Sequence, residues 1–108
     1  MKKQLLVVPD YLSSGLWGET GEVSVEAYNI SPMTKLALKY WHALWEQWDI
    51  DMPSLQPQAP SKQWIHGFYK EWWEDGKAIA QDIQASNPEM DVVYMADTPE
   101  EIEQLYYS

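Results

Sequence analysis

The sequence predicts one α/β (α+β) domain over residues 1–108, with a sheet of two or three strands covered on one face by two long helices. Two short segments rich in β-forming residues, at 5–8 and 91–95, lie near opposite ends of the chain. Between them, helical periodicity begins near residues 31 and 61, and a short C-terminal helix follows. The chain is long enough to bury a core, and the absence of cysteine excludes disulfides and thiolate metal sites.

The first strand and the loop after it have distinct compositions. Residues 5–8 (Leu-Leu-Val-Val) form an apolar run closed by a Pro-Asp pair, which predicts a central strand buried on both faces. Residues 10–21 contain three glycines and two serines, which is typical of a loop. Residues 22–26 alternate polar and apolar side chains, which predicts a short edge strand there.

The first helix is predicted from Ser31 to Trp48. A Ser-Pro pair supplies an N-cap hydroxyl and a proline at the first helical position. Two apolar ridges follow at helical spacing, and we expect them to contact the sheet and the second helix. The ridges are Met33, Ala37, Tyr40 and Leu44, and Leu38, Trp41, Trp45 and Trp48. Residues 49–61 contain three prolines and are predicted to be a connector.

The second helix is predicted over residues 61–86, where an Asn-Pro pair ends it. Its apolar stripe consists of Ile65, Phe68, Trp72, Gly76, Ile79 and Ile83. The glycine in this stripe favours close packing against another backbone. Residues 91–95 form the last predicted strand, and residues 98–107 begin with Thr-Pro-Glu-Glu, the capping-box spacing of a short acidic helix.

The charge of the chain restricts its partners. The formal net charge is −10, and all of it lies in residues 46–108, where thirteen acids stand against three lysines. There is no arginine, while tryptophan and tyrosine number seven each. Such a surface repels phosphates, which argues against nucleic acids and acidic membranes and favours a basic protein. No apolar stretch approaches the ~20 residues of a membrane span or has the form of a signal peptide, so we expect a cytoplasmic location.

Catalysis and metal binding are not predicted. His42 and His66 have no further ligands at metal-site spacing, and no cofactor motif is present, so we expect no metal and no cofactor. The serines at 13–14 do not form a nucleophile elbow. Asp10 follows the first strand, which leaves open a small hydrolase that uses Asp10, although a lone Asp there is more often a turn residue.

The candidate partner-binding residues combine carboxylates with aromatic side chains that helical patterning does not assign to the core. They are Asp10, Tyr11, Trp17, Glu71, Trp73, Glu74 and Asp75. Carboxylates of the second helix would occupy a cationic groove on the partner, and the aromatic side chains would supply apolar anchors.

Short strings along most of the chain carry a family resemblance. They are Val-Pro-Asp-Tyr at 8–11, Leu-Trp at 16–17, Ser-Pro at 31–32 with Trp41, Gly-Lys-Ala-Ile-Ala at 76–80 and Val-Val-Tyr at 92–94. Together they resemble small acidic immunity proteins of bacterial polymorphic-toxin and contact-dependent growth-inhibition systems. The resemblance implies a non-enzymatic antitoxin that binds the basic C-terminal domain of a cognate toxin, expected to be a nuclease, as a monomer or in a 1:1 complex. An alternative is a nucleic-acid-mimicking inhibitor of a host or phage DNA- or RNA-binding protein.

Overall fold

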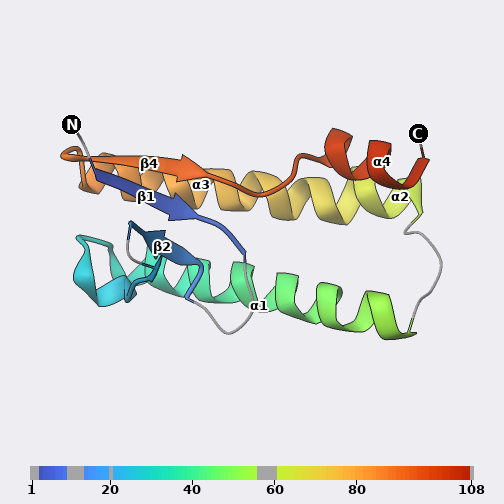
Figure 1. The fold of residues 1–108 in the computed structure, drawn as a ribbon, viewed down its shortest axis with the longest axis horizontal. Coiled ribbons are helices and arrows are strands. Elements are labelled where there is room, and N and C mark those ends of the chain that lie inside the picture. The colour runs from blue at the N-terminus through green and yellow to red at the C-terminus, as the bar shows by residue number, and fades with distance from the viewer. Residues whose placement is uncertain (1–2, 10–13, 20, 56–60, 108) are drawn as a thin grey trace.

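In the computed structural model, two long antiparallel helices lie side by side on one face of a four-stranded sheet (Figure 1). The structure describes residues 3–9, 14–19, 21–55 and 61–107, and side chains within these ranges except those of residues 48–55. The predicted fold class is confirmed, with four strands in place of two or three. In chain order the elements are β1 (Lys3–Val7), β2 (Leu16–Gly18), β3 (Gly21–Glu22), η1 (Val25–Ala27), α1 (Pro32–Leu55), α2 (Lys62–Trp64), η2 (Ile65–Tyr69), α3 (Lys70–Ser86), β4 (Met90–Tyr94) and α4 (Pro99–Tyr107).

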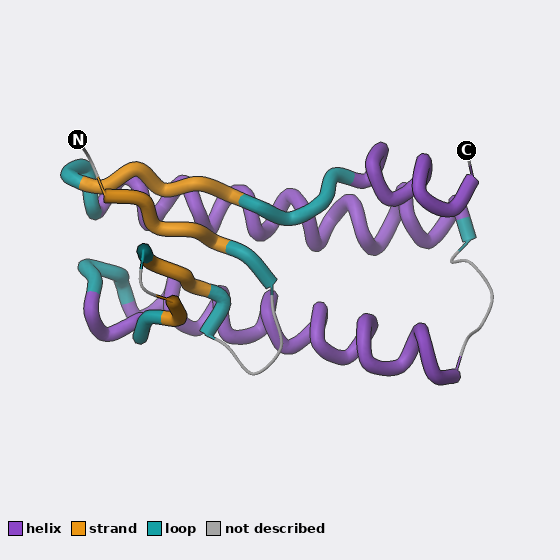
Figure 2. The backbone as a smooth tube through the Cα atoms, viewed as in Figure 1, coloured by secondary structure: helices purple, strands orange, loops and turns teal. Residues whose placement is uncertain are grey.

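The sheet is mixed and has the order β3-β2-β1-β4 (Figure 2). β1 pairs antiparallel with β2 and parallel with β4, so Leu6 stands between Trp17 and Val93. Leu5 and Val7 are fully buried beneath the helices, as an interior strand requires. The prediction that both faces of this strand are buried is wrong, because helices cover only one face of the sheet and Leu6 is only half-buried.

Two of the four strands depart from the sequence-based expectation. β2 lies inside the segment 10–21 that was predicted to be a loop, and its pairing with β1 defines it as a strand. β3 covers only Gly21–Glu22, because a 3-10 turn follows where the strand 22–26 was expected. Both strands are too short for a composition-based prediction to identify.

Helix α1 begins as predicted and ends later than predicted. The hydroxyl of Ser31 accepts a hydrogen bond from the backbone N–H of Thr34 at 3.2 Å, which is N-cap geometry. The helix continues to Leu55, so the predicted end at Trp48 is wrong, and so is the predicted connector over residues 49–55. The rest of that predicted connector, residues 56–60, lies outside the described residues. Pro53 lies in the last turn of α1. Proline has no backbone N–H, so the helix loses one hydrogen bond there, but it still continues to Leu55.

The second predicted helix is continuous through α2, η2 and α3 and ends at Ser86, as predicted. η2 is a π-helical segment, in which the N–H of Lys70 reaches back to the carbonyl of Ile65. The wider winding of a π-helix shifts the helical phase, so Tyr69 enters the core and Phe68 turns outward with 66% of its surface exposed. The prediction of Phe68 as a core residue is therefore wrong, whereas the rest of the stripe is buried.

The two long helices are joined by a pair of stacked tryptophans. The rings of Trp41 and Trp72 lie 4.7 Å apart and within 5° of parallel. Each indole N–H donates to the backbone carbonyl of the other residue, at 3.0 and 2.7 Å. Gly76 makes room for this arrangement, since a side chain there would meet the Trp41 ring and the Tyr94 hydroxyl. The expected close packing at Gly76 is confirmed, although it is against side chains and not against another backbone.

Replacing Gly76 by alanine is expected to destabilise the fold by about 1–3 kcal/mol, because the added methyl group overpacks the Trp41–Tyr94 contact. Gly67 is the matched control, since a Cβ there meets nothing within 4 Å. Gly67→Ala should be neutral or stabilise by up to about 1 kcal/mol through helix propensity. Urea unfolding followed by tryptophan fluorescence measures both variants, and equal stabilities would contradict the close packing at Gly76.

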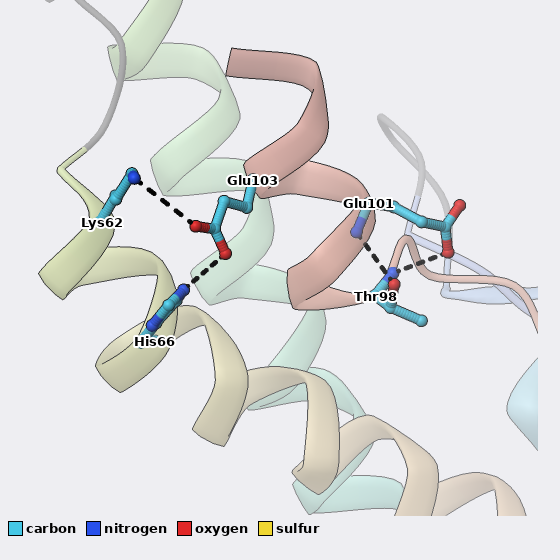
Figure 3. Close-up of polar contacts among 5 residues, drawn as sticks. All are labelled: Lys62, His66, Thr98, Glu101 and Glu103. Carbon is cyan, nitrogen blue, oxygen red and sulfur yellow. Dashed lines mark hydrogen bonds and ion pairs between the residues drawn. The ribbon is translucent and has the colours of Figure 1, made fainter. Parts of the chain in front are cut away.

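Helix α4 folds back onto the start of the second helix (Figure 3). The Thr98 hydroxyl accepts from the N–H of Glu101 and the Glu101 carboxylate accepts from the N–H of Thr98, both at 3.1 Å, so the predicted capping box is confirmed. The Glu103 carboxylate lies 2.7 Å from Nε2 of His66 and 3.9 Å from Nζ of Lys62. These contacts fix part of the acidic C-terminal region to the body of the domain.

Two tyrosines, the buried Tyr69 and the half-buried Tyr94, connect the second helix to the segment around β4. The Tyr69 hydroxyl donates to the carbonyl of Asp97 at 2.6 Å, and the Tyr94 hydroxyl donates to the carbonyl of Trp73 at 2.8 Å. Burial raises the pKa of both hydroxyls above the usual value for tyrosine, and the Asp97 charge raises that of Tyr69 further. Both groups therefore remain protonated donors at physiological pH.

Candidate partner-binding face

The sheet covers only one side of the helix pair, so the opposite side faces solvent (Figure 1). We call this surface the outer helical face. It comprises Met33, Ala37, Tyr40 and Leu44 of α1, Phe68 of η2, and Glu71, Glu74, Asp75 and Asp82 of α3, all of which are exposed. It thus combines an apolar row on one helix with an acidic row on the other.

The apolar row of α1 is the ridge that the sequence predicted to be core. The exposed fractions are 76% for Met33, 66% for Tyr40 and 44% for Leu44, so that prediction is wrong for this ridge. The other predicted ridge is buried at Leu38 and Trp41, and its Trp48 lies outside the described side chains. Helix α1 therefore buries the ridge that faces the sheet and α3. The ridge of Met33, Tyr40 and Leu44 stays exposed, because nothing in the described chain covers it.

The two rows run alongside each other. Because α1 and α3 are antiparallel and meet at Trp41 and Trp72, Leu44 and Phe68 lie one turn away at the same end of the pair. At the other end, a shallow depression of about 440 Å³ is lined by residues of both helices and of the segments next to them. The residues lining it include Met33 and Thr34 from α1 and Asp82 and Ala85 from α3.

The acidic row carries uncompensated charge. Its members are Glu71, Glu74, Asp75 and Asp82, and none of them forms an ion pair with another described residue. The described ion pairs instead use carboxylates elsewhere, at Glu26, Glu46 and Glu103. The acids of α3 are therefore available to a cationic partner.

Three of the residues proposed from the sequence lie together in this row: Glu71, Glu74 and Asp75. Trp73 does not join them, because its indole N–H donates to the carbonyl of Ala96 at 3.1 Å and its ring packs against Tyr94. These contacts hold Trp73 on the side of α3 that faces the sheet, where it is half-buried.

Trp17 lies on the opposite side of the molecule from the acidic row. It alternates along β2 with Leu16, which is fully buried toward the helices, and pairs across the sheet with Leu6. Its indole N–H is buried without a hydrogen-bond partner. Asp10 and Tyr11, the remaining proposed residues, lie outside the described part of the chain. The described members of the proposed set thus lie on different surfaces of the molecule.

The sequence-based proposal missed the exposed apolar residues of the outer helical face. The apolar arc of the first helix is wider than the ~100° stripe that a helix typically buries, and this width was the available sign of a second contact surface. Phe68 gave no such sign, because its exposure depends on the π-helical winding of η2.

A groove of about 620 Å³ beside α1 contains the residues that nucleophilic catalysis would use. Nδ1 of His42 lies 2.9 Å from the Glu46 carboxylate, four residues along the helix. The Ser14 hydroxyl donates to the carbonyl of Val23 at 2.7 Å and accepts from the N–H of Leu16, so it serves the connection around β2. Within the described ranges, no group of three or more metal-ligating side chains is gathered at one place.

None of the described helices has the length and apolar character needed to cross a membrane. No protein-family model matches this chain, and a comparison with curated proteins finds no similar sequence. The resemblance to immunity proteins therefore rests on the short strings of the chain itself.

Proposed function

We propose that this chain is an immunity protein that binds and neutralises a cognate toxin domain, a basic nuclease, through its outer helical face. The observation that carries the proposal is the uncompensated acidic row of α3 beside the exposed apolar row of α1. Exposed contiguous apolar side chains on a small domain mark a protein-binding surface. Carboxylates next to such a surface favour the binding of a positively charged protein.

The two rows have different roles in this proposal. The apolar side chains, above all Tyr40 and Phe68, supply most of the affinity when a partner removes them from water. The acids of α3 accelerate association with a basic groove and occupy it in place of phosphates. An interface of standard size, ~800 Å² on each partner, is within reach of a two-helix surface.

The apolar row also separates this proposal from the two alternatives. A nucleic-acid mimic presents carboxylates where a partner expects phosphates, and exposed side chains such as Met33 and Tyr40 have no counterpart in a phosphate backbone. The hydrolase alternative depends on Asp10, which lies outside the described residues, and the groove beside α1 lends it no support.

Co-expression with the C-terminal domain of the protein encoded directly upstream tests the proposal, with growth as the readout. The intact chain should restore growth and bind the toxin domain 1:1. The triple variant Glu71→Gln, Glu74→Gln, Asp75→Asn should associate about tenfold more slowly at low salt, because it loses the acids that attract the basic toxin. Stopped-flow association at low and high salt measures this effect.

The matched control is the triple variant Glu89→Gln, Asp91→Asn, Glu100→Gln, which removes the same charge from exposed positions outside the outer helical face. It should slow association much less. Equal slowing by both triples would show that only net charge matters, and a chain that leaves toxin-expressing cells unprotected would refute the immunity function.

A further inference from the structure

The apolar row of α1 has the spacing of a helix-packing seam. Met33, Ala37, Tyr40 and Leu44 follow one another at alternating steps of four and three residues, which keeps them in one line. With a rise of 1.5 Å per residue, this line is about 16 Å long. All four residues are exposed. Such a line can receive the side chains of another helix between its own.

The two sides of this seam differ in charge. On one side lies α3, with the unpaired carboxylates of Asp75 and Asp82. On the other side, the groove beside α1 is lined by two lysines and two glutamates, so its formal charges balance. They are Lys35, Lys39, Glu26 and Glu46, and Nζ of Lys35 lies 2.8 Å from the Glu26 carboxylate. A helix lying on the seam would therefore meet strong negative charge on one flank only.

The sheet offers a partner less than the helices do. The outer edge of β4 has no neighbouring strand, and the side chain of Gln84 covers part of it. This side chain accepts from the N–H of Val92 at 3.0 Å and donates to the carbonyl of Met90 at 2.8 Å. At the other edge, β3 is only two residues long. An added strand would find few free backbone groups at either edge.

A second copy of the chain is a poor occupant of the seam. Each copy carries a formal net charge of −10, so association through a face bordered by acids is opposed by repulsion. A cationic helix is attracted to the same face and has an apolar stripe that matches the seam.

We propose that the outer helical face docks an amphipathic α-helix of the partner, about three turns long by the length of the seam. Its apolar stripe lies along Met33, Tyr40 and Leu44, and its Lys and Arg side chains lie toward Asp75 and Asp82. The identity of the partner as a toxin rests on the proposed function. The secondary structure and charge pattern of the docking segment rest on the seam and its flanks.

A designed peptide tests this docking mode on the full chain. The probe is a fluorescein-labelled helical peptide of about fourteen residues, long enough to cover the seam, with leucines at heptad a and d positions and lysines along one flank. A second peptide carries glutamates in place of the lysines, and a third has the composition of the first in scrambled order. Fluorescence anisotropy at physiological salt gives each Kd.

The lysine peptide should bind at least about tenfold more tightly than either control peptide. Tyr40→Ser should weaken its binding about tenfold, and so should the pair Asp75→Asn, Asp82→Asn. The matched controls are Tyr106→Ser, an exposed tyrosine on α4, and the pair Glu89→Gln, Asp91→Asn. They should leave binding within about twofold, and circular dichroism should show all variants equally helical, because the substituted side chains are exposed.

Equal binding of the scrambled peptide, or of the Tyr40→Ser variant, would overturn the docking mode. Sedimentation equilibrium of the chain alone should show a monomer, and a dimer dissolved by Tyr40→Ser would assign the seam to a second copy instead. The toxin experiment separates the two proposals. If the chain neutralises the toxin and Tyr40→Ser does so equally well, the docking mode fails and the function stands. If the peptide results hold and no protection is seen, the function fails and the docking mode stands.

Discussion

Replacing Trp72 by alanine is expected to lower the free energy of unfolding by about 3–5 kcal/mol, the largest effect among the substitutions considered. The substitution removes a side chain that is 3% exposed and stacks on Trp41 at the junction of α1 and α3. It also leaves the carbonyl of Trp41 without the indole N–H that donates to it at 2.7 Å. A loss of this size is a large fraction of the ~5–15 kcal/mol that stabilises a typical domain.

Trp72→Phe tests how much of this loss a smaller aromatic ring recovers. Phenylalanine can still stack on Trp41, but it loses the N–H donor and part of the buried ring area, so the expected loss is smaller, about 2–3 kcal/mol. Urea unfolding followed by far-UV circular dichroism measures both variants, because a tryptophan signal would itself change with the substitution. An alanine variant as stable as the phenylalanine variant would show that the stack contributes little to the fold.

The features that the sequence predicted correctly are those encoded within a few residues. The Ser31 cap, the Thr98–Glu101 capping box and the extent of the second helix depend on neighbours along the chain, and the structure confirms all three. The clustering of Glu71 and Asp75 on one side of α3 is of the same kind, because a spacing of four residues fixes it.

The features that the sequence did not predict depend on contacts between distant segments. β2 is a strand because it pairs with β1 and β3, and three residues carry too little pattern to indicate that pairing. The exposure of Phe68 follows from the π-helical winding of η2, which shifts a regular α-helical phase. An apolar ridge such as that of Met33 and Tyr40 has the same composition whether it is buried in a core or exposed on the surface. Whether it is exposed depends on which side of the helix the sheet covers, and the sequence of the helix does not indicate that.

The position of the outer helical face follows from the limited cover that the sheet provides. Leu5, Val7 and Leu16 bury one side of the helix layer, and the opposite side of α1 keeps an apolar ridge without cover in the described chain. The stacked tryptophans fix α1 and α3 relative to each other. A rigid pair of rows can present a prearranged surface, which reduces the entropic cost of binding a partner.

Asn87 fixes the other end of this helix pair, and Asn87→Ala is expected to destabilise the fold by about 2–4 kcal/mol. The residue is 2% exposed. Its side-chain amide donates to the carbonyls of Asn29 and Ile83, at 2.9 and 2.8 Å, and its side-chain oxygen accepts from the N–H of Asn29 at 3.1 Å. Alanine would leave these partners unpaired at the point where the segment before α1 meets the end of α3.

The matched control for this substitution is Asn29→Ala. It removes the exposed side-chain bond to the carbonyl of Ser86 and keeps the backbone groups that Asn87 binds, so the expected loss is below about 1 kcal/mol. Chemical unfolding compares the two variants, and equal losses would show that the buried amide of Asn87 is not the element that joins these segments. Because Met33 and Asp82 lie at this end of the outer helical face, Asn87→Ala should also weaken peptide docking more than Asn29→Ala does.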